Sequence, residues 1–333
     1  MDRTNNNRTL EEVFTSIFHD KLKFKEFLEL NITKEYEVFE VKGRRLYSPT
    51  KKLKQIHRFI NGSIFEYAEY NKNVVFSYLK GVSIRDAIEK HALNQYFYQT
   101  DIRDFFGSIN GENINHSLSS QLDNTPISDI SDYINLIYNI VVIDQKLPVG
   151  FSTSPILSNI CLFNFDNELE KICISNNMTY TRYSDDIIIS SGNEINELET
   201  TSIIQSLLFN FVNNEFIVND KKTKTYKKGS GNSLLGFNIL PNGYVTIPSK
   251  DKKEVEILLH FYLTSPKSFE DYIIKNIVNR YKNQEGKSID EIGKSFLSGK
   301  LIGINAMDKK YLTKLRGKYG NTLIEMFLRK TVL

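Results

Sequence analysis

The sequence is poor in cysteine and has no long apolar segment, and both absences narrow the classes of protein to which it can belong. Only two cysteines occur in 333 residues, Cys161 and Cys173, and both fall in apolar helical patterns. We therefore expect buried free thiols in a reducing cytoplasm, without a disulfide framework or a cysteine metal site. No apolar run approaches the ~18 residues of a membrane-spanning helix. The polar start, MDRTNNNRTLEEVF, has no apolar core of a secretory signal, so no membrane partner is expected.

Internal repeats, long linkers rich in proline, glycine or serine, and histidine pairs with metal-ligand spacing are also missing. We expect His57, His91 and His116 to lie in the core or in solvent. The net charge of +3 is unevenly distributed, because the chain from Lys250 onward holds 17 Lys and Arg against 10 Asp and Glu. This basic C-terminal third favours a polyanionic partner, and a solvated helical surface is the alternative.

Hydrophobic patterns predict helices at both ends of the chain, with strands and helices mixed between them. A strand should end at Asp101, and Ser154 followed by Pro155 is typical of the start of a helix. The other expected elements are a helix over 9–32, hairpins over 36–49 and 233–247, a helix over 50–67, a strand pair over 178–190 with a tight polar turn, and helices beyond 250.

Three acids stand where apolar strands meet polar turns. Asp101 ends one strand, and Asp185 and Asp186 precede the run Ile187–Ile189. Antiparallel pairing can bring such acids side by side although 84 positions separate Asp101 from Asp185. Neighbouring carboxylates repel unless cations lie between them. Mg²⁺ binds through one or two carboxylates plus substrate phosphates, and two such ions serve phosphoryl transfer.

Strand geometry ranks the oxygens of this expected metal site. Because successive side chains on a strand point to opposite faces, Asp185 and Asp186 cannot face Asp101 equally. We expect Asp185 to be the direct ligand, Asp186 to contribute more weakly, and the backbone carbonyl of Ile102 to supply another oxygen. Taken alone, an Asp-Asp pair at a hairpin is ordinary turn chemistry, and Asp101 alone is compatible with a helix cap.

An ordered set of motifs between roughly residues 44 and 260 resembles the polymerase core of reverse transcriptases, and within it the bacterial retron and defence-associated branch. The segments, in order, are YSPTKKLKQIHRFI, similar to the first fingers motif; TDIRDFFGSI, similar to motif A; LPVGFSTSPILSNI, similar to motif B; YSDD, the Tyr-x-Asp-Asp box; VNDKKTK, similar to motif D; and LLGFNI, similar to motif E. The resemblance implies an α+β right-hand polymerase fold, with a palm of antiparallel sheet and helices, fingers and a helical thumb.

The resemblance also implies a domain plan and its partners. It places an N-terminal helical segment at 1–43, fingers and palm at 44–248, and a basic, RNA-binding helical thumb at 249–333. The implied cofactor is Mg²⁺, as two ions, with Mn²⁺ as a possible substitute. The implied partners are a structured non-coding RNA template, its DNA product, dNTPs and a toxin or effector protein, in the bacterial cytoplasm.

Individual positions inherit roles from the matching motifs. Asp101, Asp185 and Asp186 would be catalytic, and Lys222 would protonate or neutralise the leaving pyrophosphate. Phe106, five residues after Asp101, would exclude a 2′-hydroxyl and so select dNTPs; plain core packing is the alternative. At Gly150 the missing Cβ would permit close approach of a base or template strand. Lys54 and Arg58 would bind triphosphate or template phosphates. The residues expected to bind RNA are Arg280, Lys282, Lys309, Lys310, Lys314, Arg316 and Lys318.

The sequence departs from the retron pattern in places. Val149 stands where motif B usually has Gln, and Leu234-Leu235-Gly236 stands where Val-Thr-Gly is typical. Asp86 replaces the Asn of an Asn-Ala-x-x-His element, in which His91 comes one residue late. The resemblance implies an RNA-directed DNA polymerase that copies a dedicated non-coding RNA with Mg²⁺ in a retron-type anti-phage system. Because of the departures, two other functions stay open: a non-retron defence reverse transcriptase with untemplated or protein-primed synthesis, and an idle polymerase core that holds an effector as an RNA-binding scaffold.

Overall fold

Four antiparallel strands form the sheet on which the expected catalytic acids lie. The strands are β3 (Tyr96–Asp101), β4 (Met178–Tyr183), β5 (Asp186–Ser191) and β6 (Lys224–Lys227), in the order β4-β5-β3-β6. β-branched and aromatic residues fill β3, β4 and β5, as is typical of half-buried strands. The hairpin β4–β5 therefore lies beside β3, which is the antiparallel pairing expected from the acid-bearing strand ends.

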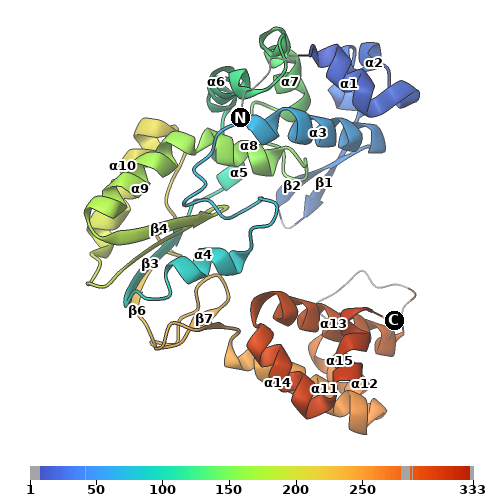
Figure 1. Cartoon of the computed structure of the whole chain (residues 1–333), viewed down its shortest axis with the longest axis vertical. Coiled ribbons are helices and arrows are strands. Elements are labelled where there is room, and N and C mark those ends of the chain that lie inside the picture. Colours follow the sequence, from blue (N-terminus) through green and yellow to red (C-terminus); the bar gives the residue numbers. More distant parts are fainter. Residues whose placement is uncertain (1–7, 42, 279–285, 287, 331–333) are drawn as a thin grey trace. The chain divides into compact units, whose positions relative to one another are not determined.

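The computed structural model describes residues 8–41, 43–278, 286 and 288–330, and the chain divides into two compact units, Met1–Lys227 and Lys228–Leu333 (Figure 1). In the described residues, none of the helices has the length and apolarity needed to cross a membrane.

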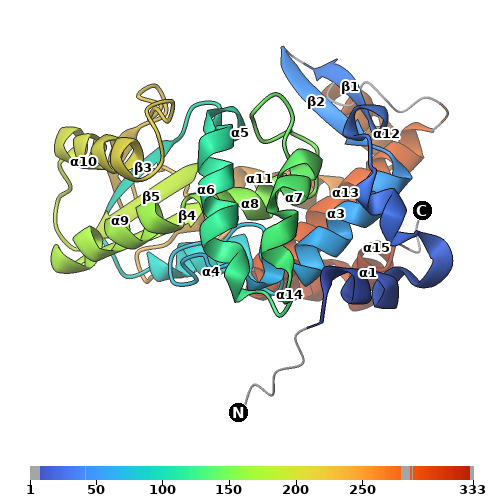
Figure 2. The same ribbon diagram turned by 90° about the horizontal axis from the view of Figure 1, so that it is seen from above.

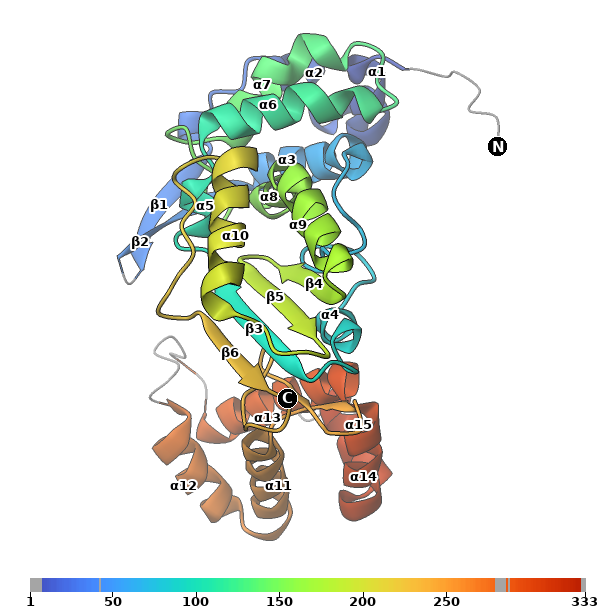
Figure 3. The ribbon, with the colours of Figure 1, turned by 90° about the vertical axis from the view of Figure 1, so that its left-hand side faces the viewer.

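Two helices cover one face of the sheet, α9 (Phe163–Ser175) and α10 (Glu197–Phe211) (Figure 3). Ile187 and Ile189 of β5 are fully buried. The hydroxyl of Tyr98 lies 2.9 Å from that of Thr201 on α10. On the opposite face, α4 (Ile84–Lys90) is followed by the buried His91, whose ring bonds to Ser190 and Thr181 of the sheet at 2.6 and 2.7 Å.

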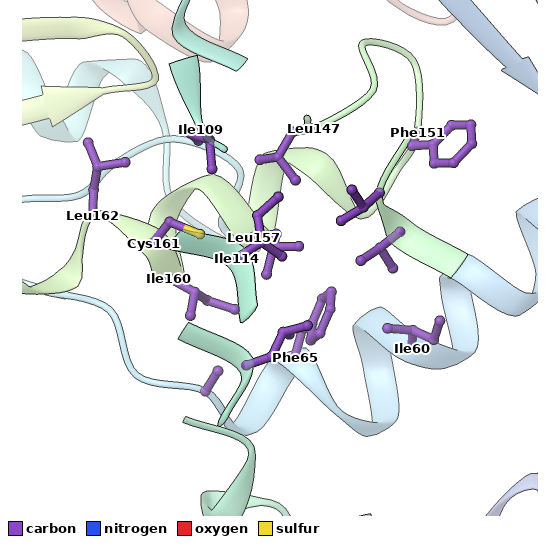
Figure 4. Close-up of a cluster of buried hydrophobic side chains, with 14 of the residues drawn as sticks. Ile60, Phe65, Ile109, Ile114, Leu147, Phe151, Leu157, Ile160, Cys161 and Leu162 are labelled. Atoms are coloured by element: carbon purple, nitrogen blue, oxygen red, sulfur yellow. The ribbon is translucent and has the colours of Figure 1, made fainter. Parts of the chain in front are cut away.

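The rest of the first unit is largely helical and includes a separate hairpin. These elements are α1 (Leu10–Phe18), α2 (Phe24–Leu28), β1 (Tyr36–Val41), β2 (Arg44–Pro49), α3 (Lys51–Ser63), α5 (Phe105–Ser108), α6 (Gly111–Gln121), α7 (Ile134–Val141) and α8 (Ser154–Cys161). Figure 2 shows α6 and α7 side by side, and in Figure 4 side chains of α3, α6 and α8 meet in one buried cluster.

The N-terminal helices belong to this same core. The Phe14 ring lies 5.1 Å from the Phe59 ring of α3. The single helix expected over 9–32 is wrong, because His19, at φ 45°, and a short 3-10 turn at His19–Lys21 separate α1 from α2. A left-handed residue cannot continue a right-handed helix. The expected cap at Ser154 is also one residue off, since Thr153 is the N-cap of α8.

The second unit begins with a short hairpin and ends in a helical bundle. Its elements are β7 (Asn238–Ile239), β8 (Val245–Thr246), α11 (Ser249–Thr264), α12 (Pro266–Asn276), α13 (Ile289–Met307), α14 (Lys309–Tyr319) and α15 (Asn321–Leu328). Asp308 is fully buried and accepts hydrogen bonds from Tyr244 at 2.6 Å, Thr246 at 2.5 Å and the Tyr311 N–H at 3.0 Å. The hairpin is thereby attached to α14 and belongs to the compact unit that starts at Lys228. The domain plan with a thumb at 249–333 stays a prediction.

Candidate active site

The predicted catalytic acids meet where β3 ends and β5 begins. Asp101 is the last residue of β3 and is only 5% exposed. The register places it directly opposite Asp186, so these two side chains share one face of the sheet. Asp185 lies in the preceding turn, and its carbonyl oxygen accepts a hydrogen bond of 3.2 Å from the Ile102 N–H. The relative importance of Asp185 and Asp186 stays a prediction.

The three acids interact electrostatically. Burial raises the pKa of Asp186 from its ordinary 3.8 to about 6, and repulsion from Asp185 and Asp101 adds to the shift. Lys222 opposes it, because its ammonium group forms an ion pair with Oδ2 of Asp101. That hydrogen bond raises the pKa of Lys222, and Asp185 and Asp186 contribute to the same shift. Lys222 is therefore protonated, and one positive charge faces a cluster of acids.

A hollow of about 330 Å³ opens beside these groups. It is lined by Gln99, Thr100, Asp101, Asp186 and the segment 221–224, which includes Lys222. Among the residues that the structure describes, two buried oxygens at this hollow accept no hydrogen bond, Oδ1 of Asp101 and Oε1 of Gln99. A buried acceptor without a donor is costly, so these oxygens favour a cation in the hollow.

The carboxylates at the hollow suit a divalent cation that takes part of its ligands from the substrate. Asp101 offers a free carboxylate oxygen, and Asp186 has a pKa raised by burial and by repulsion from Asp185 and Asp101, which a bound cation would lower again. In the described part of the chain, no group of three or more His, Cys, Asp or Glu is arranged to hold a metal ion by itself. Such a set of ligands is compatible with Mg²⁺, which commonly binds proteins through one or two carboxylates and takes its other oxygen ligands from substrate phosphates and water.

Without a divalent cation, Asp186→Asn is expected to stabilise the first unit above pH 6. The folded-state pKa of about 6 lies above the ordinary 3.8, so the favourable contribution of protonated Asp186 is full below about pH 4 and is lost as the pH rises through 6. Asparagine stays neutral, and the gain should reach about 2–3 kcal/mol at pH 8 and vanish near pH 4.

Thermal unfolding in a chelator at the two pH values measures this gain. Asp220→Asn is the matched control, because Asp220 is an exposed acid of the neighbouring segment, with 74% of its side chain accessible. Addition of Mg²⁺ should stabilise the wild type more than Asp186→Asn. Equal melting temperatures of wild type and Asp186→Asn at pH 8 would contradict a pKa of Asp186 raised by burial and by the neighbouring acids.

Two residues expected to contact the nucleotide, Phe106 and Gly150, have close contacts within the protein. Phe106, in α5, is half-buried, and its ring lies 5.3 Å from that of Phe105. Gly150 has φ +113°, and a Cβ there would fall 2.2 Å from the carbonyl oxygen of Tyr47 in β2. The backbone that closely approaches Gly150 in this structure is thus the protein's own, and the Tyr47 N–H donates to the Val149 carbonyl at 2.8 Å. Nucleotide contacts at both residues stay predictions.

The basic residues expected to bind phosphates or RNA differ in whether they form ion pairs within the protein. Lys54 and Arg58 are exposed one turn apart on α3, opposite its buried face. Lys309, Lys310 and Lys314 are exposed on α14, and among the described residues they form no ion pair. By contrast, the remaining two described candidates are paired within the unit, Arg316 with Glu325 at 2.6 Å and Lys318 with Glu256 at 2.5 Å, while Arg280 and Lys282 lie outside the described residues.

Sequence reasoning missed the groups that hold the acidic turn. Arg182 and Asp166 are fully buried and joined by two hydrogen bonds of 2.6 and 2.8 Å. Ser77 accepts a hydrogen bond of 2.8 Å from the Ser184 N–H. The sequence contains no clear signal for the pair, because Asp166 stands in a helix rich in polar residues and Arg182 lies beside Thr181 in β4. Only their complete burial shows that the two charges must be paired.

Comparisons with known proteins agree on one family. A family model described as reverse transcriptase (RNA-dependent DNA polymerase) matches residues 32–239. Retron Ec73 reverse transcriptase of Escherichia coli is 26% identical over 304 residues, which cover 86% of each chain. Retron Ec83 reverse transcriptase of Escherichia coli is 24% identical over 307 residues, covering 87% of this chain and 88% of that protein.

Solved structures give weaker likenesses. The telomerase of Candida albicans in complex with a TWJ fragment of telomeric RNA has a TM-score of 0.46 at 11% identity, over 89% of this chain and 59% of that one. Apo telomerase of Candida tropicalis has a TM-score of 0.45 at 12% identity, over 84% of this chain and 58% of that one.

Proposed function

The chain belongs to the reverse transcriptase (RNA-dependent DNA polymerase) family, and on that premise we propose that it copies a dedicated structured non-coding RNA into DNA within a retron-type anti-phage system. Membership of the family confirms the predicted α+β right-hand polymerase fold and RNA-directed DNA polymerase activity, and the relatives confirm the predicted retron type. The observation that carries the proposal is the meeting of Asp101, Asp185, Asp186 and Lys222 at one end of the sheet.

The side chains divide the work of nucleotidyl transfer. Asp101 and Asp185 would hold Mg²⁺, or Mn²⁺ in its place, with support from Asp186 and the Ile102 carbonyl. When bound, the two ions would neutralise charge on the transferred phosphate and its leaving group. Protonated Lys222, whose pKa is raised by its bond to Asp101, would neutralise or protonate the released pyrophosphate.

The proposed partners follow from the family and from surface charge. The template would be a structured non-coding RNA, gripped in part by the exposed Lys309, Lys310 and Lys314 of α14. Such contacts lose affinity as salt rises, because they displace counterions from the phosphates. The proposal also includes dNTPs as substrates, a DNA product and a toxin or effector protein as partner.

Phe106 is expected to select deoxynucleotides, and Phe106→Ala should raise the use of rNTPs relative to dNTPs by about tenfold or more. A hydrophobic pocket typically rejects a ligand that adds one hydroxyl by about a hundredfold. Single-nucleotide incorporation, compared as kcat/KM for dGTP and GTP, measures the ratio. Phe105→Leu is the control, since Phe105 is a buried neighbour, 6% exposed, whose change should lower stability and leave selectivity alone. An unchanged ratio in Phe106→Ala would assign Phe106 to core packing.

The proposed function is tested by the nucleic acid that the protein carries. We would express the chain with its native flanking DNA, beside an Asp101→Asn copy, and treat the bound nucleic acid with RNase and DNase. RNA with a discrete DNA in the wild type, and RNA alone in the variant, is the expected result. RNA without DNA in both, together with no primer extension by the wild type in Mg²⁺, would favour the scaffold. DNA unrelated in sequence to the bound RNA would favour untemplated or protein-primed synthesis.

A further inference from the structure

We propose that Ser77 and Arg182 are positioning residues that fix the turn carrying Asp185 and Asp186. We call Ser77, Tyr78 and Arg182 the turn clamp. The inference rests on the proposed function, because it concerns how the same acids are presented to substrate. It assigns a role to the segment 74–78, which no motif includes.

The turn has a conformation that its own sequence does not favour. Ser184 has φ +59°, in the left-handed region that residues with a Cβ seldom occupy. Tyr78, which faces it, is also left-handed, at φ +64°. Such conformations persist only where the surrounding structure imposes them, and they gather at active sites. Something outside the turn must therefore hold Ser184 in place.

Three hydrogen bonds from the turn clamp reach Ser184. Its N–H donates to Oγ of Ser77 at 2.8 Å, and its carbonyl oxygen accepts from Nη1 of Arg182 at 3.1 Å. Its hydroxyl lies 2.6 Å from that of Tyr78. Every polar group of the left-handed residue is therefore bonded to a clamp residue, and none of these bonds depends on Asp185 or Asp186.

The turn clamp is itself anchored in the core. The Arg182 N–H donates to the Val74 carbonyl at 2.7 Å, and the Phe76 N–H donates to the Arg182 carbonyl at 3.0 Å, so the segment 74–78 follows β4. Asn159 of α8 joins the two sides, because its amide donates to the Ser77 carbonyl at 3.0 Å and its oxygen accepts from Arg182 at 3.2 Å.

Arg182 is held in turn by α9. Asp166 accepts from Nε and Nη2 of Arg182 and from the Tyr180 hydroxyl, the last at 2.7 Å. The guanidinium fork suits this site, because it bonds a carboxylate with one edge and still has a donor for the Ser184 carbonyl. A fully satisfied buried network of this kind specifies one geometry.

The position of Ser184 sets the position of the acids. Asp185 and Asp186 follow it directly, so a change in the Ser184 backbone would rotate both carboxylates relative to Asp101. A misplacement of about 1 Å can cost a hundredfold in rate. Ser77 and Arg182 are fully buried, so they act through the turn and not by touching substrate.

Ser77→Ala tests the clamp, with Ser158→Ala as the matched control. Ser158 is also fully buried, and its hydroxyl donates to the Pro155 carbonyl at 2.7 Å, within α8. Three quantities are measured: hydrogen exchange of the Ser184 amide, kcat in primer extension, and the Mg²⁺ concentration for half-maximal rate. For Ser77→Ala we expect faster Ser184 exchange, about a tenfold lower kcat and a several-fold higher Mg²⁺ requirement, with unchanged RNA affinity and KM for dNTP.

Ser158→Ala should leave all three quantities at their wild-type values even if its melting temperature falls. Wild-type exchange, kcat and Mg²⁺ dependence in folded Ser77→Ala would overturn the inference. If Ser77→Ala does not fold, the same three quantities are measured for Tyr78→Phe. This change should be tolerated by the fold, because the Tyr78 side chain is 41% exposed. If the wild type itself makes no DNA, the proposed function fails, and Ser184 exchange still decides whether the clamp holds the turn.

Discussion

Asp185→Asn is expected to lower DNA synthesis by at least about a hundredfold while RNA binding stays at the wild-type level. Neutralising one ligand of the proposed metal site removes part of the charge stabilisation that the ions give, and the loss of several kcal/mol converts to a tenfold lower rate for each ~1.4 kcal/mol. RNA affinity should not change, because the predicted RNA contacts are basic side chains of the second unit. Primer extension on a defined RNA template, with dNTPs and Mg²⁺, measures the rate, and filter binding measures the affinity.

The same assay ranks the two neighbouring acids. If Asp185 is the direct ligand, Asp186→Asn should lose less activity than Asp185→Asn, although the register places Asp186 opposite Asp101. The reverse order would assign the direct role to Asp186. Asp132→Asn removes an exposed acid far from the sheet in sequence and serves as the charge control. Wild-type synthesis by Asp185→Asn would rule out the proposed metal site.

Arg182→Met is expected to destabilise the first unit by about 3–5 kcal/mol, the usual result of removing one partner of a buried ion pair. Both Arg182 and Asp166 have fully buried side chains. Without the guanidinium, the Asp166 carboxylate keeps only the Tyr180 hydroxyl as a donor among its described partners. The buried negative charge is then uncompensated. Urea unfolding followed by circular dichroism measures the difference.

The double variant Arg182→Met/Asp166→Leu separates loss of packing from loss of charge balance. Replacing both members of a buried ion pair by apolar residues of similar size is often neutral or stabilising, so the double variant should be more stable than Arg182→Met. It should nevertheless make little DNA, because the donor to the Ser184 carbonyl is gone. A double variant as unstable as Arg182→Met would show that the carboxylate is not the source of the cost.

Local pattern was sufficient for the elements that carry the motifs. The alternation in 36–49 predicted the hairpin β1–β2, and the apolar runs around Asp101 and Ile187–Ile189 predicted strands. The pattern failed at His19, where a left-handed residue divides one amphipathic stretch into two helices. Nothing in the periodicity of apolar residues marks such a break, since both helices continue to bury the same kind of side chain.

The sequence by itself determined the family, the order of the motifs and the strand ends on which Asp101, Asp185 and Asp186 lie. Each motif and each strand end depends on residue type and on neighbours a few positions away, and the family follows from the order of the motifs along the chain. Only the tertiary structure decided that Asp186 is the residue opposite Asp101 and that Lys222 pairs with that aspartate. It also decided which buried groups hold Ser184, because Ser77 lies 107 positions from it in sequence. Contacts over such distances depend on how whole elements pack, which no local pattern of hydrophobicity or charge encodes.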